Sequence, residues 1–382
     1  MAVTLADVAA RARVSAATVS RVLSGNYPVA EATRARVLRA VDEMEYVVNG
    51  PASALAAASS DLVGVLVHDI ADPFFGILAG AVQAEMGRWG SLLGAPPARS
   101  PGEAGGGGSS QTKSGGEPGR GGEKLAVICS TGGVPARELT YLTLLQRQRA
   151  AAVVITGGAV EDPVHAAAVA AKTSRLAAAG TRVVVCGRPP MPDAVALAFD
   201  NRGGARRLTE HVLALGHRRI GYVAGPAGRT TTRHRLEGHR AALAAQGAVG
   251  AEGAAAERLT LFGPYDRSCG YDATVELLRR EPELTAVVAA NDTIALGACA
   301  ALRDQGRRIP QDVSVAGFDD LPFSADATPS LTTVRLPLQS VGARAGRLAL
   351  GREPLPPGGV AMIRAELMAR SSTAPPRPGS AH

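Results

Sequence analysis

Apolar residues follow one pattern in the first part of the chain and a different one from Leu62 onward. From Thr4 to Leu23, apolar side chains recur every three or four residues in two short stretches, which predicts two helices joined by a tight turn. Thr4, with Asp7 three residues later, and Ser15 stand just before these stretches, where helix caps are expected. A third helix is predicted over Glu31 to Glu45, with its apolar side inward. Together these helices would form a small N-terminal domain.

From Leu62 the pattern changes to short apolar runs separated by longer segments of helical periodicity. The runs read as buried parallel strands in two sets, 62–67, 125–129, 152–155 and 182–186, then 220–223, 257–262, 286–289 and 313–317. Helices are predicted between them, near 75–90, 136–148 and 163–179, and near 203–215, 233–246, 268–280 and 293–305. Two successive sets of β-α units predict two doubly wound lobes, each with its ligand edge at the carboxyl ends of its strands.

One segment fits neither pattern. Residues 95–123 contain ten Gly, four Pro and four Ser, and no aliphatic or aromatic side chain larger than that of alanine. Such a segment cannot bury enough apolar surface to fold, so we predict a disordered insertion in the first lobe. The last residues, 374–382, are predicted to form a disordered tail.

Composition favours a large soluble protein with a polyanionic partner. The 382 residues are 46% hydrophobic, and the net charge is +7 with a pI near 9.6. No signal-peptide pattern and no run of about 18 apolar residues occurs, so we expect a cytoplasmic protein with no membrane partner. The cysteines lack metal-ligand spacing, and we expect buried reduced thiols at Cys129, Cys186, Cys269 and Cys299.

The sequence lacks the motifs of common enzyme classes. The Gly-rich stretch 102–122 has no G-x-x-x-x-G-K-[ST] motif, and no G-x-G-x-x-G motif opens a helix. Ser, His and Asp residues show no nucleophile-elbow arrangement. We therefore expect no enzymatic activity, no cofactor and no metal site.

The outward face of the second predicted helix suits a DNA major groove. It carries small or hydrogen-bonding side chains and one cation, namely Ala16, Ala17, Thr18, Ser20 and Arg21. Small side chains allow close approach, and the arginine can reach a guanine edge or a phosphate. The same pattern also fits an ordinary helical hairpin with a solvated polar face, because helix-turn-helix patterns are loose.

The segment from Asp7 to Leu23, DVAARARVSAATVSRVL, closely resembles the DNA-binding headpiece of the lactose-repressor (LacI/GalR) family of bacterial transcription regulators. The resemblance implies a headpiece over 1–48 and a hinge over 49–60 that orders as a helix in the minor groove, where Leu55 would wedge between base pairs. The DNA-contacting residues would be Thr4, Ser15, Ala16, Ala17, Thr18, Ser20, Arg21, Asn26, Tyr46, Asn49, Ala52 and Leu55.

Several positions depart from the family pattern. Arg13 replaces the turn glycine, which costs about 1 kcal/mol if the site needs a positive φ. Ala30 replaces a capping serine, and Ser53 and Ala56 stand where basic hinge residues are common. Residues 1–60 hold six Arg against five acidic residues, so DNA affinity would depend on placement and on two copies of the headpiece.

The resemblance extends to about residue 373, apart from the insertion, and implies lobes like those of periplasmic sugar-binding proteins. The predicted fold is therefore an all-α headpiece followed by an α/β core of two doubly wound parallel-sheet lobes. The first lobe would comprise 61–199 plus about 332–351, and the second 200–331 plus about 352–373. A cleft between the lobes is the natural ligand site.

Four motifs fall where strand ends would meet this cleft: DIADPFF at 69–75, RLEG at 235–238, ANDTIALG at 290–297 and GFDD at 317–320. By family position, the effector-contacting residues would be Asp69, Phe74, Phe75, Arg235, Tyr265, Asn291, Asp292 and Asp319, with Asp292 supporting Asn291. Carboxylate, guanidinium and amide groups suit pairs of hydroxyls, and aromatic rings suit the apolar face of a sugar.

Other residues near the cleft allow more than one interpretation. His68 and His239 occupy positions where the family usually has a proline and an aromatic residue. The pair Asp200 and Asn201 is either a turn cap or an element at a lobe crossing or a domain contact.

These features predict a transcriptional repressor that binds a roughly palindromic operator as a homodimer. A sugar or related polyol, or a nucleoside-like molecule, would bind in the cleft as effector. The alternative is a cytoplasmic sugar-binding sensor with weak or vestigial DNA binding, which the low headpiece charge and the altered hinge favour.

Overall fold

The chain divides into two compact units. The computed structural model describes residues 3–24, 28–44, 60–94, 124–247 and 256–377. One unit contains Met1–Asp61 and Trp89–Lys124, and the other contains Leu62–Arg88 and Leu125–His382. Residues 49–59 of the predicted hinge, the predicted insertion and part of the loop before Pro28 lie outside the described residues.

The N-terminal helices form around a small apolar core. They are α1 (Leu5–Ala12), α2 (Ala16–Ser24) and α3 (Glu31–Glu43), and Val8, Val19 and Val37 are fully buried between them. Thr4 and Asp7 form the expected capping box, with the Asp7 carboxylate accepting from the Thr4 amide at 2.8 Å. The Ser15 hydroxyl accepts from the Thr18 amide at 3.1 Å, so both predicted caps are confirmed.

The turn between α1 and α2 carries backbone strain. Arg13 has φ 53° and ψ 50°, the left-handed region that glycine adopts freely. For a residue with a β-carbon, this conformation costs about 1–2 kcal/mol. The start of α3 is weak as well, because Ala30 provides no side-chain hydrogen bond to the first turn.

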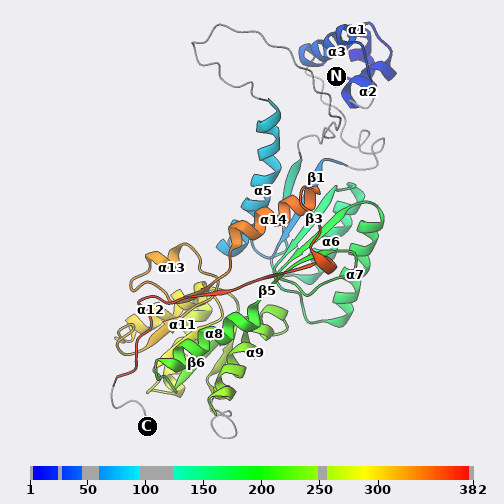
Figure 1. The fold of residues 1–382 in the computed structure, drawn as a ribbon. Helices are drawn as coiled ribbons and strands as arrows, with labels where there is room; N and C mark the ends of the chain where they lie inside the picture. The colour runs from blue at the N-terminus through cyan, green and yellow to red at the C-terminus, as the bar shows by residue number, and fades with distance from the viewer. Residues whose placement is uncertain (1–2, 25–27, 45–59, 95–123, 248–255, 378–382) are drawn as a thin grey trace, which may run out of the picture. The chain divides into compact units, whose positions relative to one another are not determined.

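The first lobe is built on a six-stranded parallel sheet in the order β11-β5-β4-β3-β1-β2. Its strands are β1 (Leu62–Val67), β2 (Leu125–Ser130), β3 (Ala152–Thr156), β4 (Arg182–Cys186), β5 (Val195–Phe199) and β11 (Val360–Ile363). Figure 1 shows α5 (Pro73–Gly94) and α14 (Leu338–Leu350) on one side of this sheet and α6 (Pro135–Arg147) and α7 (Pro163–Ala178) on the other.

The second lobe has a four-stranded parallel sheet in the order β7-β6-β8-β9. Its strands are β6 (Ile220–Ala224), β7 (Thr260–Phe262), β8 (Ala286–Ala289) and β9 (Ser314–Ala316). The helix pair α8 (Asn201–Ala214) and α9 (Thr230–Ala245) lies on one side, and the pair α11 (Arg267–Arg280) and α12 (Asp292–Asp304) on the other (Figure 1). Short α13 (Phe323–Asp326) follows β9, and the 3-10 helix η1 (Pro357–Gly359) precedes β11.

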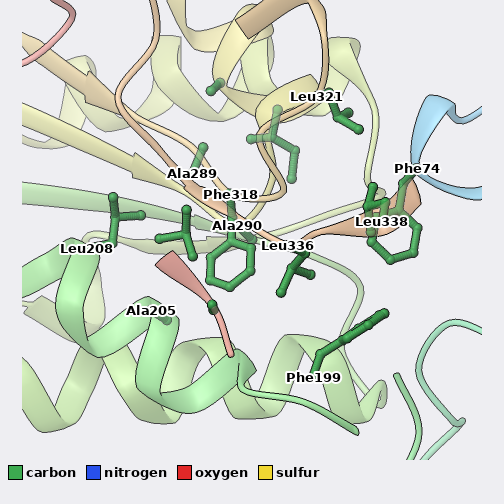
Figure 2. Packing of buried hydrophobic residues seen from close by; sticks show 14 of the residues in the cluster. Phe74, Phe199, Ala205, Leu208, Ala289, Ala290, Phe318, Leu321, Leu336 and Leu338 are labelled. Atoms are coloured by element: carbon green, nitrogen blue, oxygen red, sulfur yellow. The ribbon is translucent and has the colours of Figure 1, made fainter. Parts of the chain in front are cut away.

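The described chain crosses between the lobes three times. It passes from β5 into α8, from β10 (Thr333–Arg335) into α14, and from β11 to β12 (Glu366–Met368). β10 and β12 pair antiparallel, so two of the crossings run side by side. One apolar cluster is continuous through this region, and Figure 2 shows Phe199, Phe318 and Leu336 within it.

Most predicted strands and helices are present with small shifts at their ends, but the strand expected over 257–262 is only Thr260–Phe262, because residues 256–258 are helical. Two lobe limits are also wrong. β10 bridges to the second lobe through the pair Asp319 and Arg335, whereas 332–351 was expected in the first lobe. β11 extends the first sheet beside β5, whereas 352–373 was expected in the second lobe. Both errors arise because three- and four-residue strands are assigned by their partners, which a sequence pattern does not reveal.

The predicted disordered tail is wrong for residues 374–377. The carbonyl oxygen of Ala374 accepts from His217 Nε2 at 2.8 Å, and Arg377 forms an ion pair with Asp312 at 2.9 Å. Residues 378–382 lie outside the described residues. These contacts tie the C-terminal segment to the second lobe.

The cysteines are only partly as expected. All are free thiols, and Cys186 and Cys299 are buried, but Cys129 and Cys269 are half-buried. None of the described helices is long and apolar enough to cross a membrane.

Candidate functional site

A cavity of about 270 Å³ lies between the two lobes, with residues of both in its wall. Its residues follow the carboxyl ends of the strands, as expected for doubly wound lobes that face each other. The first lobe supplies His68, Asp69, Asp72, Phe74, Phe75, Gly132, Gly157, Gly158, Gly187 and Phe199. The second supplies Asn201, Pro226, Arg229, Thr231, Arg235, Pro264, Tyr265, Asp266, Asn291 and Asp319.

The polar centre of this wall is Arg235, which projects from α9 and is 3% exposed. Its Nη2 donates to Asp319 Oδ1 at 2.7 Å, its Nε donates to Asn201 Oδ1 at 2.8 Å, and its Nη1 donates to the Ala290 carbonyl at 2.5 Å. The guanidinium also stacks over the Phe318 ring, 3.8 Å from its centroid. These contacts hold the Arg235 guanidinium in one orientation without any ligand.

Asp319 follows β9 and is held in an unusual backbone conformation, with φ 106°. Its side chain is 3% exposed, and burial raises the pKa of the carboxyl to about 6, although Arg235 opposes this shift. A carboxylate in a left-handed backbone conformation at a strand end is strained, and such strain is concentrated at functional sites. Its Oδ2 makes none of the Arg235 contacts, so this oxygen has the chemistry to accept a hydrogen bond from a hydroxyl group.

Two neighbouring residues at the start of α12 have different environments. Asn291 lines the cavity and caps the helix, with its Oδ1 accepting from the Ile294 amide at 2.8 Å. Asp292 was expected among the effector-contacting residues, but it is fully buried and does not line the cavity. Its oxygens instead accept from Leu321, Ser324 and Thr333.

The burial of Asp292 follows from its place on α12. Asn291 is the N-cap residue, just before the first turn of α12, whereas Asp292 is the first residue of the helix and is buried in the core. Burial, followed by the charge of Asp319, raises the pKa of Asp292 to about 7 despite three donors to its carboxylate. Asp292 therefore joins α12 to the segments around α13 and β10, and it does not support Asn291 through a hydrogen bond between their side chains.

Aromatic rings cover the first-lobe side of the cavity. Phe75 stacks on His68 with 5.9 Å between ring centroids, and Phe74 packs edge-on against Phe75 at 5.0 Å and Phe199 at 6.1 Å. Opposite them, the Tyr265 hydroxyl lies 2.9 Å from the Thr232 hydroxyl. Burial and Arg229 lower the pKa of His68 to about 4, so its imidazole is neutral near pH 7.

Of the remaining residues singled out from the sequence, some line the cavity and others do not. Asp69 lies in the wall as expected, at an exposed position. Asp200 caps α8 by accepting from the Gly203 amide at 2.9 Å, while Asn201 lines the cavity at the crossing, so both interpretations of that pair apply. His239 lies outside the cavity wall and stacks on Tyr222 at 4.4 Å.

Several wall residues were missed from the sequence, above all Asp72, Arg229, Thr231 and Asp266. Asp72 lies inside the motif from Asp69 to Phe75, so its spacing after β1 could have identified it. Asp72 Oδ1 accepts from the Phe74 amide at 3.0 Å, which caps α5. Arg229 and Thr231 follow β6 at the start of α9, and only the approach of the other lobe makes them part of a site.

Beside the cavity, residues 157–161 of the first lobe contact residues 228–233 of the second, and we call this contact the inter-lobe latch. The Thr230 amide donates to the Ala159 carbonyl, and the Ala159 amide donates to the Thr230 hydroxyl, both at 3.0 Å. The Glu161 amide donates to the Gly228 carbonyl at 2.7 Å, and the Glu161 carboxylate pairs with Arg233. The lobes are thus held together by groups that adjoin the cavity wall.

A buried ion pair supports the first-lobe side of the latch. Arg188 Nη1 lies 2.6 Å from Glu138 Oε1, and Arg188 Nε donates to the Gly157 carbonyl at 3.2 Å. His165 Nε2 lies 3.2 Å from the other Glu138 oxygen. This cluster fixes the loop after β3, which carries both Gly157 and Gly158 of the cavity wall.

The headpiece presents the surface expected for DNA contact. On and just before α2, Ser15, Ala16, Ala17, Ser20 and Arg21 are exposed. Thr18 is half-buried, and its hydroxyl lies 2.9 Å from that of Ser15. Thr4 is exposed, whereas the expected DNA contacts Asn26, Tyr46, Asn49, Ala52 and Leu55 lie outside the described residues.

Comparisons with known proteins match both parts of the chain. Residues 4–49 match the family model of bacterial regulatory proteins of the lacI family, and residues 209–373 match the periplasmic binding protein-like domain. The chain is 33% identical to the HTH-type transcriptional regulator GalR of Escherichia coli (strain K12) over 356 residues, which cover 92% of this chain and 91% of that protein. It is 32% identical to the HTH-type transcriptional regulator CelR of Thermobifida fusca over 358 residues, with 91% of each chain covered.

Solved structures give the same result. A lac repressor dimer bound to operator and the anti-inducer ONPF has a TM-score of 0.71 and 25% identity, with 98% of this chain and 100% of that chain covered. A complex of the transcriptional regulator CelR with cellobiose has a TM-score of 0.62 and 29% identity, with 97% and 99% covered. With relatives this similar over nine-tenths of its length, a helix-turn-helix headpiece and a two-lobed ligand core, the chain belongs to the LacI family of bacterial regulatory proteins.

Proposed function

We propose that this protein represses transcription by binding a roughly palindromic operator as a homodimer, and that a sugar-like polyol in the inter-lobe cavity controls this binding. The observation that carries the DNA part is the exposed face of α2, formed by Ala16, Ala17, Ser20 and Arg21 on a capped helix with a buried opposite side. Short side chains let the helix backbone approach base edges, and Arg21 supplies a cation.

The cavity supports a polyol as effector. Its second-lobe side offers the Asp319 carboxylate and the Asn291 amide, and its first-lobe side offers the rings of Phe75 and His68. A sugar ring would place its hydroxyl edge toward Asp319 and its apolar face toward the aromatic rings. The CelR–cellobiose complex shows that a relative with this fold binds a sugar, which supports the same class of ligand here.

The latch supports control by closure. An effector that contacts both lobes binds the closed arrangement more tightly than an open one, and it can shift the equilibrium only by that difference. In the closed arrangement, the contacts of Glu161 and Arg233 would add to those of the effector. The lobe angle would then set the spacing of the two hinges and headpieces of a dimer.

An exposed edge strand supports the homodimer. β2 is at the end of the first sheet, and its Leu125 is 64% exposed while Val127 and Ile128 are each 37% exposed. An apolar edge strand in water invites pairing or aggregation unless something covers it. We propose that a second copy of the chain covers this strand.

The test is operator binding at several salt concentrations. Duplexes selected from a random library with the purified protein give the operator, and titrations from 50 to 200 mM salt give the slope of log affinity, which phosphate contacts make steeply negative. Arg21→Ala is expected to lower operator affinity by at least about tenfold, because it removes a base or phosphate contact. Arg303→Ala is the matched control, because it removes an exposed arginine of α12 in the second lobe.

Selection of no duplex, or equal affinity for the wild type and Arg21→Ala, would instead favour the sugar-binding sensor with vestigial DNA binding. A loss of operator affinity in Arg21→Ala with an unchanged circular dichroism spectrum and thermal midpoint would assign the loss to the interface and not to the fold.

A further inference from the structure

The cavity has more acidic than basic groups in its wall. The carboxylates of Asp69, Asp72, Asp266 and Asp319 face two guanidinium groups, those of Arg229 and Arg235. The imidazole of His68 adds no charge near pH 7, because burial and Arg229 lower its pKa to about 4. The wall therefore carries a net negative charge before any ligand enters.

The two cations already have partners within the protein. Arg235 donates to Asn201, Ala290 and Asp319, and is buried by these contacts. Arg229 donates from Nη2 to the Gly133 carbonyl at 2.9 Å, which ties it to the opposite lobe. A phosphate in the cavity would have to compete with Asp319 for the N–H donors of the Arg235 guanidinium. Paired guanidinium donors are the geometry that binds carboxylates and phosphates most strongly.

Of the helix starts at this cavity, those of α5, α11 and α12 are capped by side chains, whereas that of α9 has no side-chain cap. A helix N-terminus binds phosphate through free backbone amides. Here Asp72 Oδ1 accepts from the Phe74 amide at 3.0 Å at the start of α5, and Asp266 Oδ1 accepts from the Cys269 amide at 2.8 Å at the start of α11. Asn291 Oδ1 does the same for α12 at 2.8 Å. Carboxylates thus cap the starts of α5 and α11, and at the start of α9 the Thr230 amide already donates to the Ala159 carbonyl at 3.0 Å.

Asp72 interacts electrostatically with charged groups of the other lobe. It belongs to the first lobe, yet Arg235 of the second lobe acts on its charge, and its own charge acts on Asp319. Burial raises the pKa of Asp72, as expected for a carboxylate that has lost water without gaining a salt bridge. Only Oδ1 is used by the cap, so Oδ2 remains as an acceptor that a ligand donor can reach.

We propose that this cavity selects an uncharged or cationic polyhydroxyl compound over the phosphorylated form of the same compound, and that Asp72 is the residue that sets this preference. This inference rests on the proposed effector role of the cavity. A neutral polyol or an amino sugar brings hydrogen-bond donors to the carboxylate oxygens. A phosphate brings further negative charge beside Asp72 and Asp319, and at the starts of α5, α11 and α12 it meets amides that already donate to side-chain caps.

The experiment compares matched pairs of ligands. The thermal midpoint of the full-length protein is measured with pentoses, hexoses, disaccharides, amino sugars and nucleosides, and with the phosphate ester of each, at constant ionic strength. A compound that binds the folded protein raises the midpoint in proportion to its occupancy. Dissociation constants for the best pair are then measured by calorimetry for the wild type and for Asp72→Asn.

Asp72→Asn removes the charge and keeps the cap, because the asparagine oxygen can accept from the Phe74 amide. The matched control is Asp162→Asn, which changes an exposed cap of α7 outside the cavity, where Asp162 accepts from the Val164 amide at 2.9 Å. We expect the wild type and the control to prefer the unphosphorylated compound. The preference is the dissociation constant of the phosphate ester divided by that of the parent compound. We expect Asp72→Asn to lower this ratio by about tenfold, roughly the effect of one charge-assisted hydrogen bond.

Three other outcomes would contradict, in turn, the selection against phosphate, the role of Asp72 and the effector site. A phosphate ester that raises the wild-type midpoint as much as its parent compound would overturn the proposed selection while leaving the effector role intact. A preference that survives unchanged in Asp72→Asn would overturn the assignment of this residue. A panel in which no compound of either kind raises the midpoint would count against the effector site itself, and the inference would fall with it.

Discussion

Gly158 and Thr231 approach each other so closely across the two lobes that a β-carbon at Gly158 would overlap Thr231 Oγ1 and lie 3.1 Å from the Thr231 amide nitrogen. Both residues line the cavity, and both belong to the inter-lobe latch. A glycine at position 158 is therefore a requirement of lobe contact.

The variant Gly158→Ala should hinder closure and weaken effector binding by tenfold or more, because the added methyl group would press on the side chain and the backbone amide of Thr231 in the other lobe. Calorimetry with the identified effector measures the loss. Gly80→Ala is the control, since a β-carbon there meets nothing within 4 Å. Equal effector affinity in Gly158→Ala and wild type would mean that ligand binding does not need the latch.

Arg235 and Asp319 should be energetically coupled. Removing either partner leaves the other charge buried, which costs about 3–5 kcal/mol, whereas removing both avoids an unpaired charge. Urea unfolding of Arg235→Ala, Asp319→Ala and the double variant measures this cycle. We expect the double variant to be clearly less destabilised than the sum of the two single variants. Additive losses would show that Asn201 and the Ala290 carbonyl suffice to hold Arg235.

Asp292 should make stability depend on pH in a direction unusual for an acidic residue. Its pKa is raised from 3.8 to about 7 on folding, so the folded protein binds more protons than the unfolded chain between these values. The contribution of Asp292 to the free energy of unfolding is therefore fully present below pH 3.8 and is lost as the pH rises toward 7.

Comparison with Asp292→Asn isolates this effect from that of the buried histidines, whose lowered pKa values act in the opposite direction. The difference in unfolding free energy between wild type and variant, measured by denaturant titration at pH 5 and pH 7.5, should move in favour of the variant as the pH rises. A pH-independent difference would place the pKa of Asp292 near its ordinary value.

Arg13 should be a site where glycine stabilises the headpiece. Its φ of 53° is allowed for glycine, so Arg13→Gly should relieve strain of about 1 kcal/mol, partly offset by greater freedom of the unfolded chain. Hydrogen exchange of the Val19 and Val37 amides in the full-length protein reports headpiece opening. We expect slower exchange in the variant, while faster exchange would mean that the arginine side chain stabilises the turn.

The fold was predictable where burial dictates the sequence. β1, β3 and β4 consist of valine-rich runs covered on both faces, and such runs have few alternatives. β10 and β12 are three residues long and exist because they pair with each other across the lobe crossing. β11 likewise depends on β5 as its partner, so no local pattern distinguishes it from a loop.

The site was predictable where a motif fixes a strand end. Asn291 and Asp319 line the cavity as the family positions imply, because they follow the ends of β8 and β9, and Arg235 reaches it from α9. Asp292 was misplaced because a one-residue step along a helix start turns a side chain from the cavity into the core. Arg229 and Thr231 were missed because their role arises from the closeness of the two lobes, which depends on Gly158 in a distant segment.

Operator and effector should act on one equilibrium of this protein. Linkage requires that the effector change operator affinity by the same factor by which the operator changes effector affinity. The most direct measurement is the dissociation constant of the selected operator duplex with and without saturating effector, set beside the effector dissociation constant with and without saturating operator. We predict equal factors of at least about fivefold, as is typical of allosteric coupling. An effector that binds the cavity and leaves operator affinity unchanged would show that the two sites are not coupled.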